Sequence, residues 1–308
     1  MHFYIIYGNI IFSDLEFPQL VPAEPVSEAM ADIVIRRGVM PEHMKRRESE
    51  RKYEFGESVS WLINKTVSFL VEVGKCITYE PRKNANIGYL RTYLLGYGLS
   101  MLHMQRGEMV FHCAAVHCHG QAVLIAGESG SGKSTLTTKL LETGYLLMAD
   151  DAALVKVEKG RVMAYPAFPY QKLCRDAALK KEYCLEDLLY IDEEKDKFMV
   201  PYTDAFSVEG KPVKRMLYLM VDSKITEPRL EEMAGINKFY CCVNNLFLRK
   251  LLQKERYGGM TGPKCLEIAA GISMYLVSRP AQTDTAEAVW QMVKGLLDIK
   301  EIESDEEM

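Results

Sequence analysis

The sequence predicts an α/β fold built around a phosphate-binding loop, with a smaller α+β region before it. The apolar run QAVLI at 121–125 leads directly into the glycine-rich stretch AGESGSGKST at 126–135. The next segment, STLTTKLLETG, has helical composition, and YLLMA at 145–149 is typical of a buried strand. Strand, helix and strand form a βαβ unit, whose crossover makes the two strands parallel.

The composition is that of an ordinary folded protein. The chain has 308 residues, of which 48% are hydrophobic and 26% charged. A formal net charge of -4 gives no general attraction to nucleic acid or to an anionic membrane. The start, MHFYIIYGNIIF, lacks the basic lead of a signal peptide, and no apolar run could span a bilayer. We therefore expect a cytoplasmic protein whose eight scattered cysteines are reduced.

Residues 1–85 are expected to form the N-terminal α+β region. The runs FYIIYGNIIF and VSFLVEV predict strands, and the charged stretch EHMKRRESERK predicts a solvated helix face or a loop. A helical pattern then extends from Ile87 to Gln105, with Gly107 as its stop. This helix opens the second region, residues 86–308, which carries the loop.

The elements around and after the loop follow from the same signals. Residues 109–127 predict two strands that turn at His119 and Gly120, the second of which feeds the loop. Later in the chain we expect a hairpin around 158–160, a helix in CRDAALKKEY, strands in KFMVPY and RMLYLMVD, mostly helix over 240–275 apart from the glycine-rich YGGMTG, and a last helix in VWQMVKGLLDI.

The glycine-rich stretch matches the pattern G-x-x-x-x-G-K-[ST] at Gly127, Gly132, Lys133 and Ser134. Glycines allow successive N–H groups to turn inward around an anion, and the following helix adds its positive end. Lys133 can reach the β and γ oxygens of a triphosphate, and the Ser134 hydroxyl can bind Mg²⁺. ATP and Mg²⁺ are the expected ligands, and the residues expected to bind the nucleotide are Gly127, Glu128, Ser129, Gly130, Ser131, Gly132, Lys133, Ser134 and Thr135.

Two acids, Asp150 and Asp151, end the strand that follows the loop's helix. Because parallel strands end at the same edge of a sheet, at least one carboxylate should stand near the γ-phosphate. One acid could hold Mg²⁺ while the other accepts a proton from an attacking hydroxyl. The alternative is that either Asp caps the next element or lies in a turn.

Five residues before the loop, His112, Cys113, His117, Cys118 and His119, are of types that bind metals. Strand alternation would send His112 and Cys118 to one face and the others to the opposite face. A four-ligand tetrahedral site is therefore awkward to build here.

The segment FHCAAVHCHGQAVLIAGESGSGKSTLTTKLLETGYLLMADDAALV resembles the catalytic core of the HPr kinase/phosphorylase family, which is related to the nucleotide-binding domain of phosphoenolpyruvate carboxykinases. In that family a histidine precedes the first loop glycine by fifteen residues, and an acid pair begins seventeen residues after the loop lysine. His112 and Asp150 stand at those spacings from Gly127 and Lys133. The resemblance implies a core of the HPr kinase/phosphoenolpyruvate carboxykinase type with a mixed sheet.

By this resemblance Asp150 would be the catalytic base, His112 would tune or orient it, and Asp151 would assist the metal. The family also uses an arginine after a later strand to bind phosphate, and Arg229 is the nearest counterpart. Further cations that could serve a phosphate-rich cleft are Lys172, Arg175 and Lys197. The glycine-rich signature of the family is absent. YIIYGNIIFSDLEFPQL and FPYQKL are more similar to HPr-kinase-like proteins of peptide biosynthetic clusters.

These features together predict an ATP- and Mg²⁺-dependent kinase that acts on a serine or threonine hydroxyl of a peptide or small protein. A small-molecule phosphotransferase or carboxykinase-like enzyme is one alternative. A non-catalytic protein whose partner binding responds to the nucleotide is another. Nucleic acid and membrane are not expected partners, and the resemblance implies a possible homo-oligomer.

Overall fold

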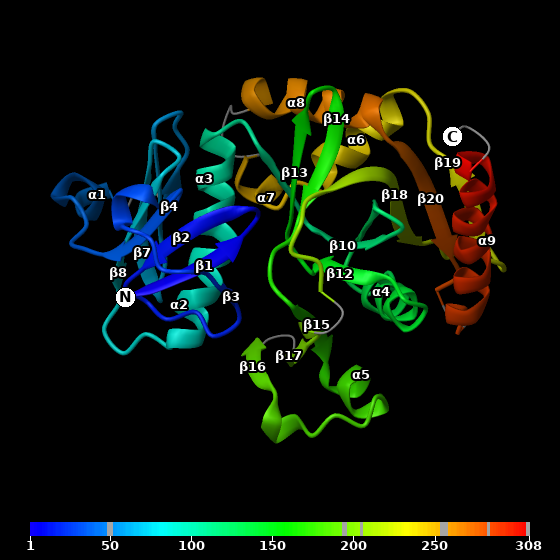
Figure 1. Cartoon of the computed structure of the whole chain (residues 1–308), viewed down its shortest axis with the longest axis horizontal. Helices are drawn as coiled ribbons and strands as arrows, with labels where there is room; N and C mark the ends of the chain where they lie inside the picture. The colour runs from blue at the N-terminus through cyan, green and yellow to red at the C-terminus, as the bar shows by residue number, and fades with distance from the viewer. Residues whose placement is uncertain (48–51, 193–195, 204–205, 253–257, 282–283, 306–308) are drawn as a thin grey trace.

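The computed structural model describes residues 1–47, 52–192, 196–203, 206–252, 258–281 and 284–305 (Figure 1). Its N-terminal part is an eight-stranded sheet in the order β3-β1-β2-β4-β8-β7-β6-β5. The strands are β1 (His2–Ile6), β2 (Asn9–Ser13), β3 (Val21–Pro22), β4 (Ile33–Arg37), β5 (Tyr53–Glu54), β6 (Val59–Ile63), β7 (Val67–Glu72) and β8 (Cys76–Pro81). Two short helices flank them, η1 (Glu28–Met30) and α1 (Glu42–Arg47).

The sequence patterns of this part are confirmed where the structure describes them. FYIIYGNIIF forms the β1–β2 hairpin, and VSFLVEV forms β7. The charged stretch EHMKRRESERK begins as α1, and its residues 48–51 lie outside the described residues.

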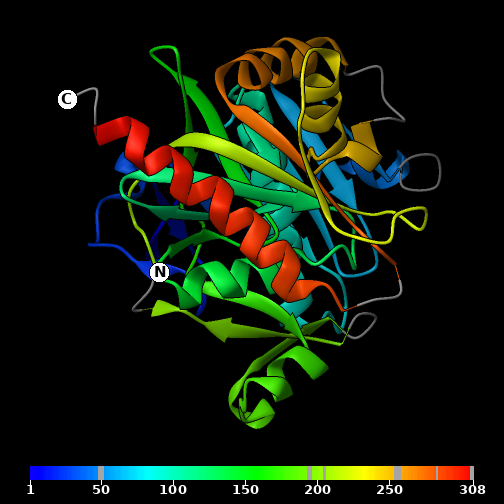
Figure 2. The same cartoon turned by 90° about the vertical axis from the view of Figure 1, so that its right-hand side faces the viewer.

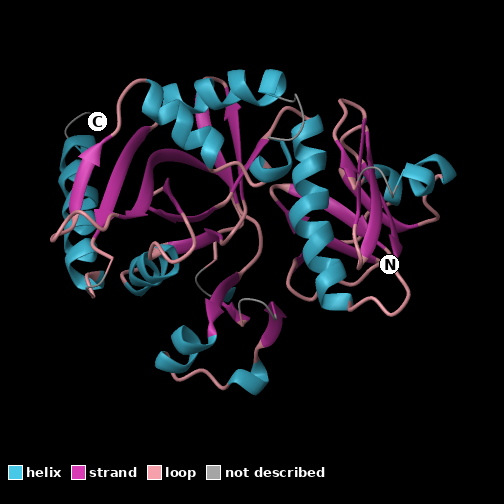
Figure 3. Ribbon diagram, turned by 180° about the vertical axis from the view of Figure 1, so that it is seen from behind, coloured by secondary structure: helices cyan, strands magenta, loops and turns pink. Residues whose placement is uncertain are grey.

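One long helix stands between the N-terminal sheet and the rest of the molecule (Figures 1 and 3). It comprises α2 (Ile87–Tyr93), the π-helical turn η2 (Leu94–Gly98) and α3 (Leu99–Gln105). The Asn86 side chain caps its start by accepting from the amides of Gly88 and Tyr89. A single hydrophobic cluster joins both sheets through this helix, with Phe69, Leu102 and Leu124 among its fully buried members. The division into 1–85 and 86–308 stays a prediction.

The second sheet has nine strands, most of them in the order β12-β10-β11-β18-β14-β13-β9, with β20 also paired to β18 and β19 paired to β20. Both parallel and antiparallel pairs occur, so the predicted mixed α/β class is confirmed. The strands are β9 (Met109–Phe111), β10 (Cys113–Cys118), β11 (Gln121–Gly127), β12 (Leu146–Ala149), β13 (Ala153–Glu158), β14 (Arg161–Tyr165), β18 (Lys211–Val221), β19 (Arg229–Glu232) and β20 (Ser273–Arg279).

Two details around the loop differ from the simplest prediction. The strand expected from 109 is broken at His112, because β9 pairs with β13 whereas β10 pairs with β11 and β12. The predicted turn holds, with positive φ at His119 and Gly120. Strands β11 and β12 both run antiparallel to β10, which lies between them. They are therefore parallel, as predicted, but not neighbours.

Helices cover both faces of this sheet. On one face α4 (Lys133–Glu142) and α9 (Ala286–Asp305) pack with β11 around Ile125, Leu140 and Val293. Figure 2 shows α9 lying across this face. The other face carries α6 (Ile236–Asn244), α7 (Arg249–Leu252) and α8 (Gly258–Gly271). No helix of the described residues is long and apolar enough to span a bilayer.

A small three-stranded sheet, which we call the arm (residues 170–201), projects from the second sheet at the bottom of Figure 1. It contains β15 (Tyr170–Cys174), α5 (Arg175–Lys180), η3 (Leu185–Asp187), β16 (Leu189–Asp192) and β17 (Lys197–Pro201), in the strand order β15-β17-β16. The predicted helix in CRDAALKKEY and the predicted strand in KFMVPY are α5 and β17. The arm matters because β15 begins just beside the acid pair.

Candidate functional site

The glycine-rich loop connects β11 to α4 and has the backbone geometry of an anion cradle. Gly127, Gly130 and Gly132 have φ of 138°, 81° and 107°, which other residues rarely adopt. A Cβ at Gly127 would collide with the carbonyl oxygen of Leu219 and lie 2.8 Å from Ser131 Oγ. The first glycine of the pattern is therefore required by close packing as well as by its φ.

Lys133 folds back over the loop that it follows. Its Nζ donates to the carbonyl oxygens of Gly127 at 2.6 Å and Glu128 at 3.0 Å. Burial lowers the pKa of this ammonium, and the charges of Asp151 and Asp150 oppose that effect. Lys133 and the acid pair therefore lie within electrostatic reach of each other.

Arg279, at the end of β20, braces the loop from the other side. Its Nη2 donates to Gly130 O at 2.7 Å and its Nε to Ser131 O at 3.0 Å. Sequence reasoning missed this residue. The available signal was its place directly after the apolar run SMYLVS, at the carboxyl end of a strand parallel to the one that bears the loop.

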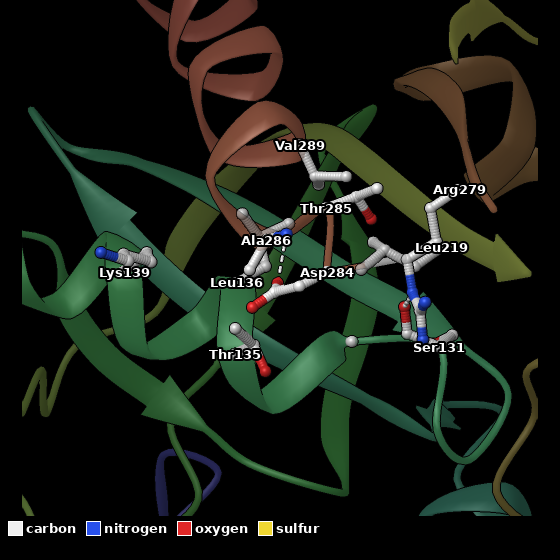
Figure 4. Close-up of a pocket in the computed structure, with 11 residues that line it drawn as sticks. Ser131, Thr135, Leu136, Lys139, Leu219, Arg279, Asp284, Thr285, Ala286 and Val289 are labelled. Carbon is white, nitrogen blue, oxygen red and sulfur yellow. Dashed lines mark hydrogen bonds between the residues drawn. The ribbon is translucent and has the colours of Figure 1, made fainter. Parts of the chain in front are cut away.

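A cavity of about 200 Å³ lies between the starts of α4 and α9, beside the loop (Figure 4). Leu136, Leu219 and Val289 give it an apolar side, and Thr135 and Arg279 add polar groups. At its rim the Asp284 carboxylate accepts from the amide of Ala286 at 3.2 Å, which caps the start of α9. A pocket that is mostly apolar with a few polar groups suits a small aromatic ligand part.

Asp150 is the buried member of the acid pair. It follows β12 directly, is 9% exposed, and accepts a hydrogen bond from the Lys172 amide at 2.7 Å. Burial, with the nearby negative charge of Asp151, raises the pKa of Asp150 to about 6. Its carboxylate is therefore ionised at neutral pH and more basic than an ordinary aspartate.

Asp151 has the opposite character. Its Oδ2 accepts from Lys172 Nζ at 2.7 Å, and its Oδ1 lies 3.3 Å from His112 Nδ1. Burial alone would raise its pKa, but the charges of Lys172 and His112 outweigh burial and hold the pKa well below its usual range. Two adjacent carboxyls with pKa values pushed apart are typical of a division between a proton acceptor and a permanent anion.

His112 contacts Asp151 rather than Asp150. Its Nδ1 lies 3.0 Å from the backbone oxygen of Asp151, and its own amide donates to Asn245 O at 2.6 Å. The ring also packs edge-on against Phe247. Burial lowers the pKa of His112, while Asp151 partly opposes this. Any influence of His112 on Asp150 therefore passes through Asp151.

The four additional cations fall into two groups. Lys172 bonds both acids, and the charge of Lys197 lowers the pKa of both Asp150 and Asp151, so Lys197 lies within electrostatic reach of the pair. Arg175 instead forms a bidentate pair with Asp196 at 2.6 and 2.9 Å on the exposed surface of the arm. Arg229 is exposed on β19, and among the described residues no hydrogen bond or ion pair joins Arg175 or Arg229 to the acid pair.

The histidines and cysteines around β10 do not assemble with each other. Within the described part of the chain, no three His, Cys, Asp or Glu side chains form a group that could hold a metal ion. A Mg²⁺ ion at the loop would draw its ligands from the Ser134 hydroxyl, Asp151 and the phosphates of a nucleotide, which is the usual arrangement for this cation.

Comparison with known proteins points to one family. Residues 105–169 match the family described as HPr Serine kinase C-terminal domain. The HPr kinase/phosphorylase of Clostridium tetani is 28% identical over 131 residues, which cover 42% of this chain and 34% of that protein. The HPr kinase/phosphorylase of Caldicellulosiruptor bescii is 30% identical over 83 residues, which cover 25% of this chain and 27% of that protein.

The matches span about a third or less of the length of these two relatives. Among solved structures, the Hpr(Ser) kinase/phosphatase of Coxiella burnetii aligns with 64% of this chain and 98% of its own, at 15% identity and a TM-score of 0.34. The family match at residues 105–169 confirms the resemblance predicted for the segment that holds the loop, whereas the association with peptide biosynthetic clusters stays a prediction. The region of this chain that carries the loop and the acid pair is similar to the HPr kinase/phosphorylase family.

Proposed function

We propose that the chain is an ATP- and Mg²⁺-dependent kinase that transfers the γ-phosphoryl group to a serine or threonine hydroxyl of a peptide or small protein. The observation that carries this proposal is the Asp150 carboxylate, which directly follows the strand after the loop's helix, is 9% exposed and accepts from the Lys172 amide at 2.7 Å; its burial raises its pKa to about 6. A base of this strength beside a phosphate loop suits transfer to an alcohol better than simple nucleotide storage.

The nucleotide would lie across the loop. The amides from Gly127 to Thr135 and the ammonium of Lys133 would hold its phosphates, and Arg279 would keep the loop in shape through its bonds to Gly130 and Ser131. The base and ribose would enter the cavity between α4 and α9, whose apolar side includes Leu136 and Val289.

The residues beside the loop fit a hard divalent cation. Ser134, at the start of α4, offers a hydroxyl, and Asp151 offers a carboxylate held ionised by its neighbours. Bound there, Mg²⁺ would neutralise charge on the phosphate oxygens. Asp151 Oδ2 also accepts from the Lys172 ammonium, so the carboxylate would contact both the lysine and the cation.

Asp150 would act as the general base. It would accept the proton of the acceptor hydroxyl as the oxygen attacks phosphorus, the bond from phosphorus to the β-phosphate oxygen breaking as the new one forms. The Lys172 amide fixes one oxygen of this carboxylate at 2.7 Å, and the other oxygen would meet the hydroxyl. His112 and Lys172 would hold Asp151 in place beside it.

The test is phosphate transfer from labelled ATP with Mg²⁺ to a panel of serine- and threonine-containing peptides and small carrier proteins. The wild type is expected to form a stable phosphoester, and both Lys133→Ala and Asp150→Asn are expected to abolish it. Asp176→Asn, which changes an exposed acid on α5, is the matched control and should stay active.

Two outcomes would favour the alternatives. Tight ATP binding with no transfer to any hydroxyl, and a partner affinity that changes with ATP, would indicate a nucleotide-responsive binding protein. Transfer confined to a small metabolite would indicate a small-molecule phosphotransferase. Either result would contradict the proposed peptide or protein kinase.

A further inference from the structure

The tip of the first hairpin reaches from the N-terminal sheet into the second sheet. Tyr7 and Gly8 form the turn between β1 and β2, with φ of 53° and 71°. Tyr7 is 2% exposed, and its amide donates to the carbonyl oxygen of Pro166 at 2.7 Å, beyond the end of β14. Figure 1 shows this hairpin extending past α3 toward β13. Tyr7, near the start of the chain, is thus buried against the second sheet, which carries the candidate site.

The Tyr7 hydroxyl bonds the residue that follows the acid pair. Its Oη donates to the carbonyl oxygen of Ala152 at 3.0 Å. Burial, with the nearby Cys113 and Asp151, raises the pKa of Tyr7, so the hydroxyl keeps its proton and remains a donor. Asp151 itself has a φ of 72° in the left-handed region, where a residue with a Cβ is strained by roughly 1 kcal/mol or more. A bond to the next carbonyl stabilises that turn.

The Tyr7 ring is itself held firmly. It packs edge-on against the buried His103 of α3, with 5.3 Å between ring centroids. The Tyr7 carbonyl oxygen accepts from Asn9 Nδ2 at 2.9 Å, and Asn9 Oδ1 accepts in turn from Arg106 Nη1 at 2.8 Å. The hydroxyl is therefore presented to Ala152 by a fixed side chain on a fixed turn, which is what a positioning role needs.

We propose that Tyr7 is a positioning residue for the acid pair, and that the N-terminal sheet supports phosphoryl transfer through this one hydroxyl. The inference rests on the proposed kinase function. By fixing the Ala152 carbonyl, Tyr7 keeps Asp151 in its left-handed conformation, where its carboxylate meets Lys172 and His112 beside Asp150. In the part of the chain that the structure describes, Tyr7 bonds Ala152, Pro166 and Asn9 but not the nucleotide loop, so ATP affinity should not depend on it.

The test compares Tyr7→Phe with Tyr4→Phe. Both changes remove one hydroxyl from a buried tyrosine of the same hairpin and keep the ring, but Tyr4 Oη accepts from the Phe17 amide inside the N-terminal sheet. We expect Tyr7→Phe to lower kcat about tenfold, the worth of roughly one hydrogen bond, with KM for ATP unchanged. Tyr4→Phe should leave kcat and KM as in the wild type.

Amide hydrogen exchange gives a readout that does not need activity. Peptides that cover 148–154 should exchange faster in Tyr7→Phe than in Tyr4→Phe and the wild type, because the turn after the acid pair loses its restraint. Unchanged exchange there, or equal kcat in the two variants, would overturn the positioning role. An inactive wild type would refute the kinase function, and the exchange comparison would still decide the Tyr7 contact.

A second variant covers the case in which Tyr7→Phe does not fold. Asn9→Ala releases the Tyr7 carbonyl and the link to Arg106 while leaving the hydroxyl in place. It should show the same pattern in a weaker form, a lower kcat with unchanged KM for ATP. A rise in KM with unchanged kcat would contradict the inference.

Discussion

Lys172 and Asp151 form a half-buried ion pair, 2.7 Å between Nζ and Oδ2, that connects the arm to the core. The same lysine donates its amide to Asp150, so one residue of β15 touches both acids. The position of the arm therefore affects the pKa values of both acids, because Lys172 contributes to each of them.

Replacing this lysine should change the pH dependence of transfer. The charge of Lys172 lowers the pKa of Asp150, so Lys172→Met removes a favourable partner and should raise that pKa further. In plots of kcat against pH, the acidic limb, where activity rises with pH, should move to higher pH, because Asp150 must be ionised to accept a proton. Lys180→Met, an exposed lysine on the arm, is the control. A limb that stays in place would show that Lys172 does not act on the base.

Removing the charge of Asp150 should stabilise the fold while it abolishes transfer. The pKa of this carboxyl is raised to about 6 in the folded state, so the folded protein binds its proton more tightly than the unfolded chain does. Stability contributed by the protonated form is present below the unfolded pKa and is lost as pH rises through about 6. Asn at this position keeps an acceptor for the Lys172 amide and carries no charge.

Asp150→Asn should therefore unfold at a higher temperature than the wild type at pH 7.5, with a gain of about 1 to 3 kcal/mol. At pH 4 or below the difference should shrink, because the wild-type carboxyl is protonated there. Thermal unfolding at the two pH values measures this directly. If Asp150→Asn and the wild type unfolded at equal temperatures at pH 7.5, burial of the Asp150 charge would not destabilise the folded state, which would contradict this prediction.

Gly127→Ala should damage both the fold and nucleotide binding. The added Cβ would collide with the Leu219 carbonyl, and φ at this residue is 138°. Gly120→Ala is the matched control, since it also has a positive φ, 74°, but has nothing within 4 Å of the added carbon. The control should cost about 1 to 2 kcal/mol from backbone strain alone, and the loop variant clearly more. Urea unfolding and ATP titration of both variants measure the difference.

The sequence predicted the loop and the acid pair because those features are local, whereas the mixed sheet was implied only by the family resemblance. Gly127, Lys133 and Asp150 lie within one βαβ unit, where a strand, a helix and their order fix which residues meet. The contacts of Lys172 and Tyr7 depend on how an arm and a separate sheet fold back onto that unit. No hydrophobic periodicity or sequence motif around Tyr7 indicates that its hydroxyl bonds a residue 145 positions away.

The position of Arg279 also depends on a long-range contact that the sequence does not predict. The sequence predicts mostly helix up to residue 275 and assigns no element to 276–285, whereas α8 ends at Gly271 and β20 spans Ser273–Arg279. The glycine-rich GGMTG, expected to interrupt the helix, lies within α8. Once β20 is paired in parallel with β18, its last residue falls beside the loop. The apolar run SMYLVS indicates a strand, but only its pairing with β18 places the arginine beside the loop.

The cavity between α4 and α9 should decide how much of the nucleotide's affinity comes from its base. Ala286 lines this cavity, and a tryptophan there would fill much of its roughly 200 Å³. Ala286→Trp should weaken ATP binding about tenfold or more, because the base loses its place. Binding of inorganic tripolyphosphate, which needs only the loop and Lys133, should not change.

Ala288→Trp, two residues further along α9 at an exposed position, is the control for the effect of a tryptophan on this helix. It should leave the binding of both ligands intact. Calorimetric titration with ATP and with tripolyphosphate separates the two contributions in each variant. Since the loop and the cavity share Ser131 and Gly132, equal weakening of both ligands in Ala286→Trp would mean that the substitution distorts the loop itself. Unchanged ATP binding would place the base outside this cavity.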